Sequence, residues 1–132
     1  MKNELLIREE SLRRFSLRAR WRSFRFAFEG LYEFFRQQHN AIIHLLMTVL
    51  VLMASIFFKI NRAEIFAVAF SVGFVWTAEL FNTAIEKLAD MVSKDFHPKI
   101  KFIKDVSAAA VLVAALTAFV TGLVVFIPKL FP

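Results

Sequence analysis

Three long runs of apolar residues constrain this chain more than any other feature of its sequence. They cover residues 41–58, 65–85 and 106–127. Each approaches the ~20 residues that a helix needs to cross ~30 Å of hydrocarbon. The ionisable members of these runs are His44 in the first and Glu79 in the second. A 132-residue chain that is 58% hydrophobic is too apolar for an ordinary soluble domain. The sequence therefore predicts an all-α integral membrane protein with three transmembrane helices.

The expected organisation is a single membrane domain over residues 1–132. Its parts are a polar tail at 1–16, an interfacial helix at 17–38, and transmembrane helices at 41–60, 63–90 and 100–127. The third transmembrane helix is expected to end before Pro128.

The segment before the first apolar run has the pattern of an amphipathic helix. Its large apolar residues recur at spacings of four and three, at Leu17, Trp21, Phe24, Phe28, Leu31 and Phe35. Arginines recur beside them, so that an aromatic face adjoins a basic face. Such a helix suits the headgroup layer of a membrane. The alternative is a soluble helix that packs on another domain.

Positive charge is unevenly distributed along the chain. Nine of the 17 Lys and Arg residues precede Asn40, and Lys94, Lys99, Lys101 and Lys104 lie between the second and third apolar runs. The positive-inside rule then places the N-terminus and this link in the cytoplasm. The net charge of +6 could also suggest nucleic acid. We expect no nucleic-acid partner, because the basic residues flank membrane segments, where anionic headgroups explain them.

A stripe of polar residues crosses the end of the second apolar run. Glu79, Asn82, Glu86 and Asp90 fall at i, i+3, i+7 and i+11, so they line one face of a helix. Carboxylates bind hard cations such as Mg²⁺, and a partly desolvated carboxylate is suited to take a proton from an alcohol. This pattern predicts a metal and general-base site. The alternative is hydrogen bonding between helices that holds an oligomer together.

Two further groups are candidates for a nucleotide site. Lys104 can neutralise phosphate charge, and Asp105 can fix that lysine or a ligand. The alternative for this pair is simple anchoring at the membrane surface. The loop Asp95-Phe96-His97 can contact a nucleotide or be a solvated turn. The chain has only three glycines, so no glycine-rich phosphate loop can form and side chains with a metal must hold any nucleotide.

The histidines near the inner membrane surface do not predict a zinc site. His39 and His44 lack partners at the spacing that zinc ligands need.

These residues together resemble the prokaryotic diacylglycerol kinase and undecaprenol kinase family. The resemblance is carried by Glu79-x-x-Asn82-Thr83-Ala84-Ile85-Glu86, then Asp90, His97, Lys104-Asp105 and Ala108-Ala109-Ala110-Val111. It extends over roughly residues 24–130. It implies a homotrimer of three-spanning subunits, each with an N-terminal surface helix, that uses MgATP in the bacterial cytoplasmic membrane.

The resemblance also implies roles for individual residues. Glu79 corresponds to the catalytic base and Asn82 to its supporting amide. Glu86 and Glu33 correspond to acids that bind the metal and, through it, the nucleotide. Asp95, Phe96, His97, Lys104 and Asp105 match positions that contact the nucleotide. Gln38 departs from the pattern, because the family usually has Glu there, and this puts a charge-dependent role at that position in doubt.

The predicted function is ATP-dependent phosphorylation of a membrane lipid alcohol. The ending 126–130 and the compact spacing from Gly30 to Asn40 look more like the undecaprenol-preferring branch, with diacylglycerol as the close alternative. Two other classes remain open. A proton- or ion-conducting oligomer would need the polar stripe to continue through 65–78, where only Ser71, Trp76 and Thr77 are available. A non-catalytic adaptor that displays the basic helix would leave Glu79 and Asn82 unexplained.

Overall fold

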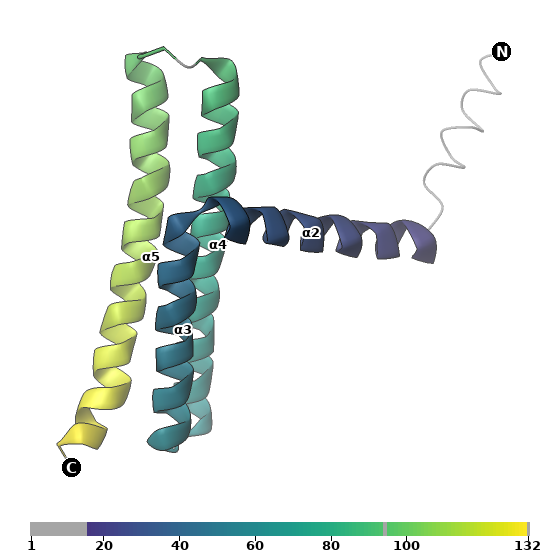
Figure 1. Ribbon diagram of the computed structural model, residues 1–132. Coiled ribbons are helices and arrows are strands. Elements are labelled where there is room, and N and C mark those ends of the chain that lie inside the picture. Colours follow the sequence, from purple (N-terminus) through teal and green to yellow (C-terminus); the bar gives the residue numbers. More distant parts are fainter. Residues whose placement is uncertain (1–15, 94, 132) are drawn as a thin grey trace, which may run out of the picture. The chain divides into compact units, whose positions relative to one another are not determined.

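The computed structural model describes residues 16–93 and 95–131, and each regular element among them is a helix. The helices are α2 (Leu17–Gln37), α3 (His39–Phe57), α4 (Arg62–Val92) and α5 (Pro98–Leu130) (Figure 1). The predicted polar tail at 1–16 lies, apart from Ser16, outside the described residues. The chain forms two units, one up to Arg36 and one from Gln37 onward. Each unit is described by itself.

The first unit is the helix α2. Its aromatic side chains Trp21, Phe24 and Phe28 are exposed. Arg25 pairs with Glu29 at 3.3 Å between Nε and Oε1. The helix itself lies where the sequence placed it, and its amphipathic, interfacial character stays a prediction.

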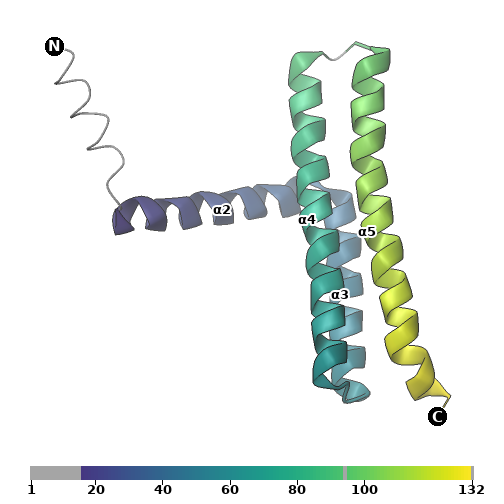
Figure 2. The same ribbon diagram turned by 180° about the vertical axis from the view of Figure 1, so that it is seen from behind.

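The second unit contains the membrane segments. Among the described residues, three helices, α3, α4 and α5, are long and apolar enough to cross a membrane. At 1.5 Å per residue, the 19 residues of α3 span about 28 Å, whereas the 31 residues of α4 span about 46 Å. Figures 1 and 2 show α4 and α5 antiparallel and side by side, with α3 beside only part of α4. The end of α4 and the start of α5 therefore project beyond the first residues of α3.

Local sequence signals set the ends of these helices. Asn61 caps α4 through a capping box, because its Oδ1 accepts from the backbone N–H of Glu64 at 3.1 Å, and Glu64 Oε2 accepts from the backbone N–H of Asn61 at 2.7 Å. Pro98 is the first residue of α5, where its missing N–H costs nothing. His97 precedes it, and its Nδ1 accepts from the backbone N–H of Lys99 at 3.2 Å.

Two helix ends differ from the sequence expectation. The helix α3 ends at Phe57 rather than near residue 60, because Lys59 adopts a left-handed backbone with φ of 49°. The helix α5 continues through Pro128 to Leu130 instead of ending before the proline. Pro128 lies in the last turn, where only one ladder hydrogen bond is lost, and Phe131 N–H still donates to the carbonyl of Ile127 at 3.2 Å.

An apolar cluster holds the three long helices together at the α3–α4 turn. Ile60, Val68 and Val125 are buried there, with Phe58 and Phe126 packed against them. One polar contact adds to this end, between Lys129 Nζ of α5 and Glu64 Oε2 of α4 at 3.1 Å. This cluster packs α5 against α4 at the end of the pair that is farthest from the α4–α5 loop.

Candidate active site

The buried face of α4 changes character along its length. Its buried residues are Val68, Ser71, Val75, Glu79, Asn82 and Ala89, which recur at helical spacing. The face is largely apolar up to Val75 and becomes polar at Glu79. The polar stripe predicted from the sequence is therefore directed inward, at least for Glu79 and Asn82, and not toward lipid.

Glu79 is the most deeply buried polar side chain of this face. It is 2% exposed, against 7% for Asn82. Within residues 16–93 and 95–131, its Oε2 atom has no hydrogen-bond partner. The imidazole of His44 on α3 lies close to it, with Nε2 3.9 Å from that oxygen. A buried carboxylate without a donor is costly, so this oxygen is ready to accept a hydrogen.

Asn82 links two helices through a short chain of hydrogen bonds. The hydroxyl of Ser107 on α5 donates to Asn82 Oδ1 at 2.7 Å, and it shares this proton with the backbone carbonyl of Lys104 at 2.9 Å. The other end of the Asn82 amide, Nδ2, donates to Glu86 Oε1 at 3.2 Å. Because the amide oxygen of Asn82 accepts and its nitrogen donates, these hydrogen bonds orient both the Asn82 side chain and the Glu86 carboxylate.

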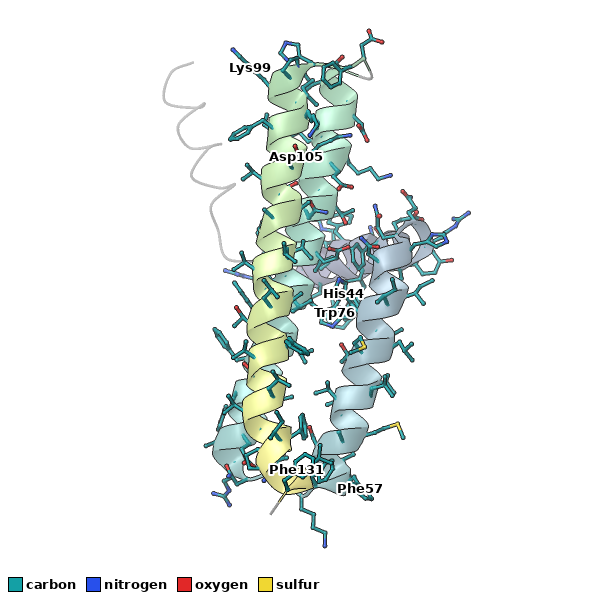
Figure 3. The ribbon with its side chains drawn as sticks, turned by 90° about the vertical axis from the view of Figure 1, so that its left-hand side faces the viewer. His44, Phe57, Trp76, Lys99, Asp105 and Phe131 are labelled. Carbon is teal, nitrogen blue, oxygen red and sulfur yellow. The ribbon has the colours of Figure 1, made fainter. Side chains whose placement is uncertain are left out.

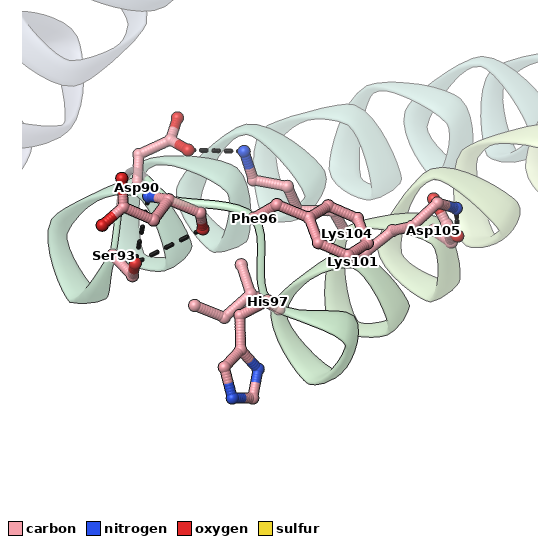
Figure 4. Close-up of a pocket in the computed structure, with 9 residues that line it drawn as sticks. Asp90, Ser93, Phe96, His97, Lys101, Lys104 and Asp105 are labelled. Carbon is pink, nitrogen blue, oxygen red and sulfur yellow. Dashed lines mark hydrogen bonds and ion pairs between the residues drawn. The ribbon is translucent and has the colours of Figure 1, made fainter.

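A pocket of about 320 Å³ lies where α4 ends and α5 begins (Figure 4). Its lining includes all five residues that were predicted to contact a nucleotide: Asp95, Phe96, His97, Lys104 and Asp105. Phe96 is 80% exposed, so its ring offers a free face for stacking. The structure thus brings these five residues to one place, and their role toward a nucleotide stays a prediction.

Two ion pairs cross the rim of this pocket. Lys104 on α5 pairs with Asp90 on α4, and Lys101 pairs with Asp105 within α5 (Figure 4). Lys104 therefore pairs with Asp90. The sequence had also allowed a pair with the neighbouring Asp105, which instead pairs with Lys101. The pair joins the two helices, and it keeps a primary amine beside the pocket.

Glu33 lies on α2, in the unit that ends at Arg36. Its side chain is half exposed and its Oε1 lies 3.8 Å from Arg36 Nη1. Its role in metal binding, together with Glu86 of the other unit, stays a prediction.

The donor atoms suit a magnesium ion that is held mainly by phosphate. In the part of the chain that the structure describes, no three His, Cys, Asp or Glu side chains gather as a metal site. Mg²⁺ at phosphoryl-transfer sites needs only one or two carboxylates besides the phosphates. The Glu86 carboxylate, oriented by Asn82 close to the pocket end of α4, fits this requirement.

Two residues of the site had no predicted role. Ser107 lies one helical turn after Lys104, on the face that meets Asn82, and this spacing is the signal that could have identified it. His44 is the single ionisable residue of the first apolar run, and Figure 3 shows it beside Trp76 where α3 meets α4. An ionisable side chain in a membrane segment is by itself a signal of function.

Comparison with known proteins identifies the family. The prokaryotic diacylglycerol kinase family matches residues 25–126. The undecaprenol kinase of Bacillus subtilis is 33% identical over 110 residues, which cover 83% of this chain and 89% of that protein. The diacylglycerol kinase of a Synechocystis species is 34% identical over 109 residues, which cover 82% of this chain and 62% of that protein. The chain therefore belongs to the prokaryotic diacylglycerol kinase family of lipid kinases.

Proposed function

We propose that this protein transfers the γ-phosphate of ATP to the hydroxyl of a membrane lipid alcohol, with undecaprenol as the preferred acceptor. The observation that carries the proposal is the arrangement along α4 and α5. A buried carboxylate at Glu79 is followed, further along the same helix pair, by the oriented Glu86 and then by a pocket with Lys104. A lipid alcohol at Glu79 and a triphosphate in the pocket can therefore meet along this helix pair.

Glu79 is the general base in this proposal. The lipid hydroxyl reaches it from the bilayer, and the carboxylate accepts the hydroxyl proton. The alkoxide oxygen attacks the γ-phosphorus in line, and the bond to the β–γ bridging oxygen breaks, which releases ADP. Asn82 supports the base from the next turn of the helix. General-base assistance of this kind typically contributes about 10²–10⁴-fold to the rate.

The nucleotide occupies the pocket at the α4–α5 end. Lys104 offsets charge on the phosphates, Phe96 and His97 contact the base or ribose, and Asp95 and Asp105 accept hydrogen bonds at the rim. Glu86 and Glu33 would hold Mg²⁺ together with the phosphates, and the ion would neutralise charge that develops during transfer. Positioning and charge stabilisation are the main needs of phosphoryl transfer, so few side chains suffice.

Undecaprenol is preferred over diacylglycerol as the acceptor for two reasons. The Bacillus undecaprenol kinase is matched over 89% of its length, whereas the Synechocystis diacylglycerol kinase is matched over 62% of its length. The spacing from Gly30 to Asn40 and the residues at 126–130 also look more like the undecaprenol branch.

The same resemblance supports a homotrimer in the bacterial cytoplasmic membrane, with the N-terminus and the α4–α5 loop in the cytoplasm. The basic residues near both segments support this orientation by the positive-inside rule. The helix α2 then lies in the headgroup layer, with Trp21, Phe24 and Phe28 toward the acyl chains. Native mass spectrometry from detergent tests the trimer, and a monomer or dimer as the active species would contradict it.

Incubation of the purified protein with labelled ATP and Mg²⁺ tests the activity. Undecaprenol and diacylglycerol are supplied in separate mixed micelles, and the labelled lipid product is quantified. We expect both lipids to be phosphorylated, with the higher kcat/KM for undecaprenol. A higher kcat/KM for diacylglycerol would reverse the substrate preference, and labelling of neither lipid would overturn the proposed activity.

A further inference from the structure

The carboxylate of Glu79 is buried in a way that requires a donor. Its side chain is 2% exposed, and within the described residues its Oε2 has no hydrogen-bond partner. An isolated buried carboxylate is destabilised strongly unless a proton donor or a positive charge faces it. A base that must be ionised before each turnover therefore needs a donor on its second oxygen.

His44 is the residue placed to supply that donor. Its Nε2 lies 3.9 Å from Glu79 Oε2, which is longer than the 2.7–3.2 Å typical of a hydrogen bond. Catalytic hydrogen bonds are often long without substrate and shorten in the reacting complex. The His44 side chain is 20% exposed, so water competes little for its Nε2–H.

A second contact holds the two helix faces in register at this point. One turn further along α3, Thr48 Oγ1 accepts from Trp76 Nε1 of α4 at 3.1 Å and donates to the carbonyl of His44 at 2.7 Å. The His44 ring also lies edge-on to the Trp76 ring, with centroids 6.2 Å apart and planes at 66° (Figure 3). Thr48 and Trp76 thus fix the backbone and the ring of His44 opposite Glu79.

We infer that His44 is a positioning residue for the general base. As the neutral imidazole it donates Nε2–H to Glu79 Oε2, which leaves the other carboxylate oxygen to accept the proton of the lipid hydroxyl. This inference rests on the proposed function for the identity of the base. Through this contact α3, which contributes no residue to the pocket at the α4–α5 end, would also take part in turnover.

The inference is tested with His44→Ala and His44→Gln, because glutamine replaces the Nε2–H donor with an amide N–H of similar reach. His39→Ala is the matched control, since it makes the same change at an exposed position of the same helix. We expect kcat of His44→Ala to fall roughly 10- to 100-fold, the range for a lost hydrogen bond to a charged group. The KM values for ATP and lipid should change less than about threefold, because the contact acts on the base and not on binding.

Glutamine should restore most of the kcat lost in the alanine variant, and His39→Ala should match the unaltered protein. In a Glu79→Gln background, His44→Ala should change kcat by less than about twofold, because the residue acts through Glu79. A His44→Ala variant with normal kcat overturns the inference. Equal losses of kcat in His44→Ala and His44→Gln also overturn it. So does a loss of kcat from His44→Ala that is as large in the Glu79→Gln background as in the unaltered protein.

Thermal unfolding in detergent gives a readout that does not depend on lipid phosphorylation. The shifts in Tm from His44→Ala and Glu79→Gln should be non-additive in the double variant, because the two side chains interact. Additive shifts overturn the contact whatever the activity is. Failure of the unaltered protein to phosphorylate any lipid would instead overturn the proposed function, while non-additive shifts would still support the contact between His44 and Glu79.

Discussion

The two ends of the α4–α5 pair are built from the same helix faces but hold together by different chemistry. Near the α3–α4 turn, Val68 and Val125 are buried among aliphatic and aromatic side chains. Toward the α4–α5 loop, the same face of α4 presents Glu79 and Asn82 instead. The apolar end is stabilised mainly by side-chain packing, whereas the polar end is stable only if each buried polar group has a hydrogen-bond partner. In the proposed mechanism, function is concentrated at the polar end, and the apolar end contributes stability.

The largest expected effect comes from removing the charge at Glu79. The substitution Glu79→Gln keeps the size of the side chain but removes the base, so kcat should fall by about 10²–10⁴-fold. Lipid phosphorylation with labelled ATP measures this. The matched control is Glu64→Gln, the same change on the same helix at the apolar end, where the carboxylate contacts Lys129. Near-normal turnover in Glu79→Gln would remove this residue from the mechanism.

A smaller loss is expected when Ser107 no longer holds the Asn82 amide. The substitution Ser107→Ala leaves Asn82 Oδ1 buried without its donor, a change that typically costs about 1–3 kcal/mol, which would lower kcat by roughly 5- to 150-fold if the whole cost falls on the transition state. The matched control is Ser71→Ala, which removes a hydroxyl that donates to Thr121 Oγ1 at 3.0 Å nearer the apolar end. If both variants lose the same activity, the polar chain at Asn82 has no special role.

The apolar end should respond in stability and not in activity. The substitution Val125→Ala opens space beside Ile60 and Val68, and we expect it to lower the free energy of unfolding by about 0.5–3 kcal/mol. The neighbouring Val124 is 70% exposed, so Val124→Ala serves as the control with little change. Unfolding in mixed micelles measures both. A large drop in the kcat of folded Val125→Ala protein would show that the two ends are coupled.

The smallest effect is expected at the start of α4. The substitution Asn61→Ala removes the acceptor for the Glu64 N–H and should cost about 1 kcal/mol of stability, whereas Asn61→Ser should keep the cap. Thermal unfolding of both variants checks this. Identical midpoints for Ala and Ser would mean that the cap contributes nothing, and altered lipid phosphorylation would contradict the separation of the two ends.

The sequence predicted the number and approximate positions of the membrane helices because apolar length is a strong signal for an element that must cross hydrocarbon. Helical spacing also predicted that Glu79 and Asn82 share one face, and the structure shows that this face is buried at both residues. Helix ends were less predictable. The helix α3 ends where Lys59 adopts a left-handed backbone conformation. Pro128 is tolerated because it lies in the last turn of α5.

Contacts between helices were the least predictable part of the site. The pairing of Lys104 with Asp90, 14 residues away, depends on the register of α5 against α4. The approach of His44 to Glu79 depends likewise on how α3 meets α4. Register depends on contacts spread along the helices, from the apolar cluster to the hydrogen bonds of Ser71 and Ser107, so no local pattern around Lys104 or His44 contains it.

The length of α4 has a consequence for how two unlike substrates can meet. Glu79 lies about 26 Å from the first residue of the helix, within the thickness of the hydrocarbon, and Asp90 lies about 42 Å along it, beyond that thickness. The single helix α4 is therefore long enough to extend from the hydrocarbon of the membrane into the aqueous phase. In the proposed mechanism the lipid stays in the membrane and the nucleotide stays in water, because different turns of α4 contact the two substrates.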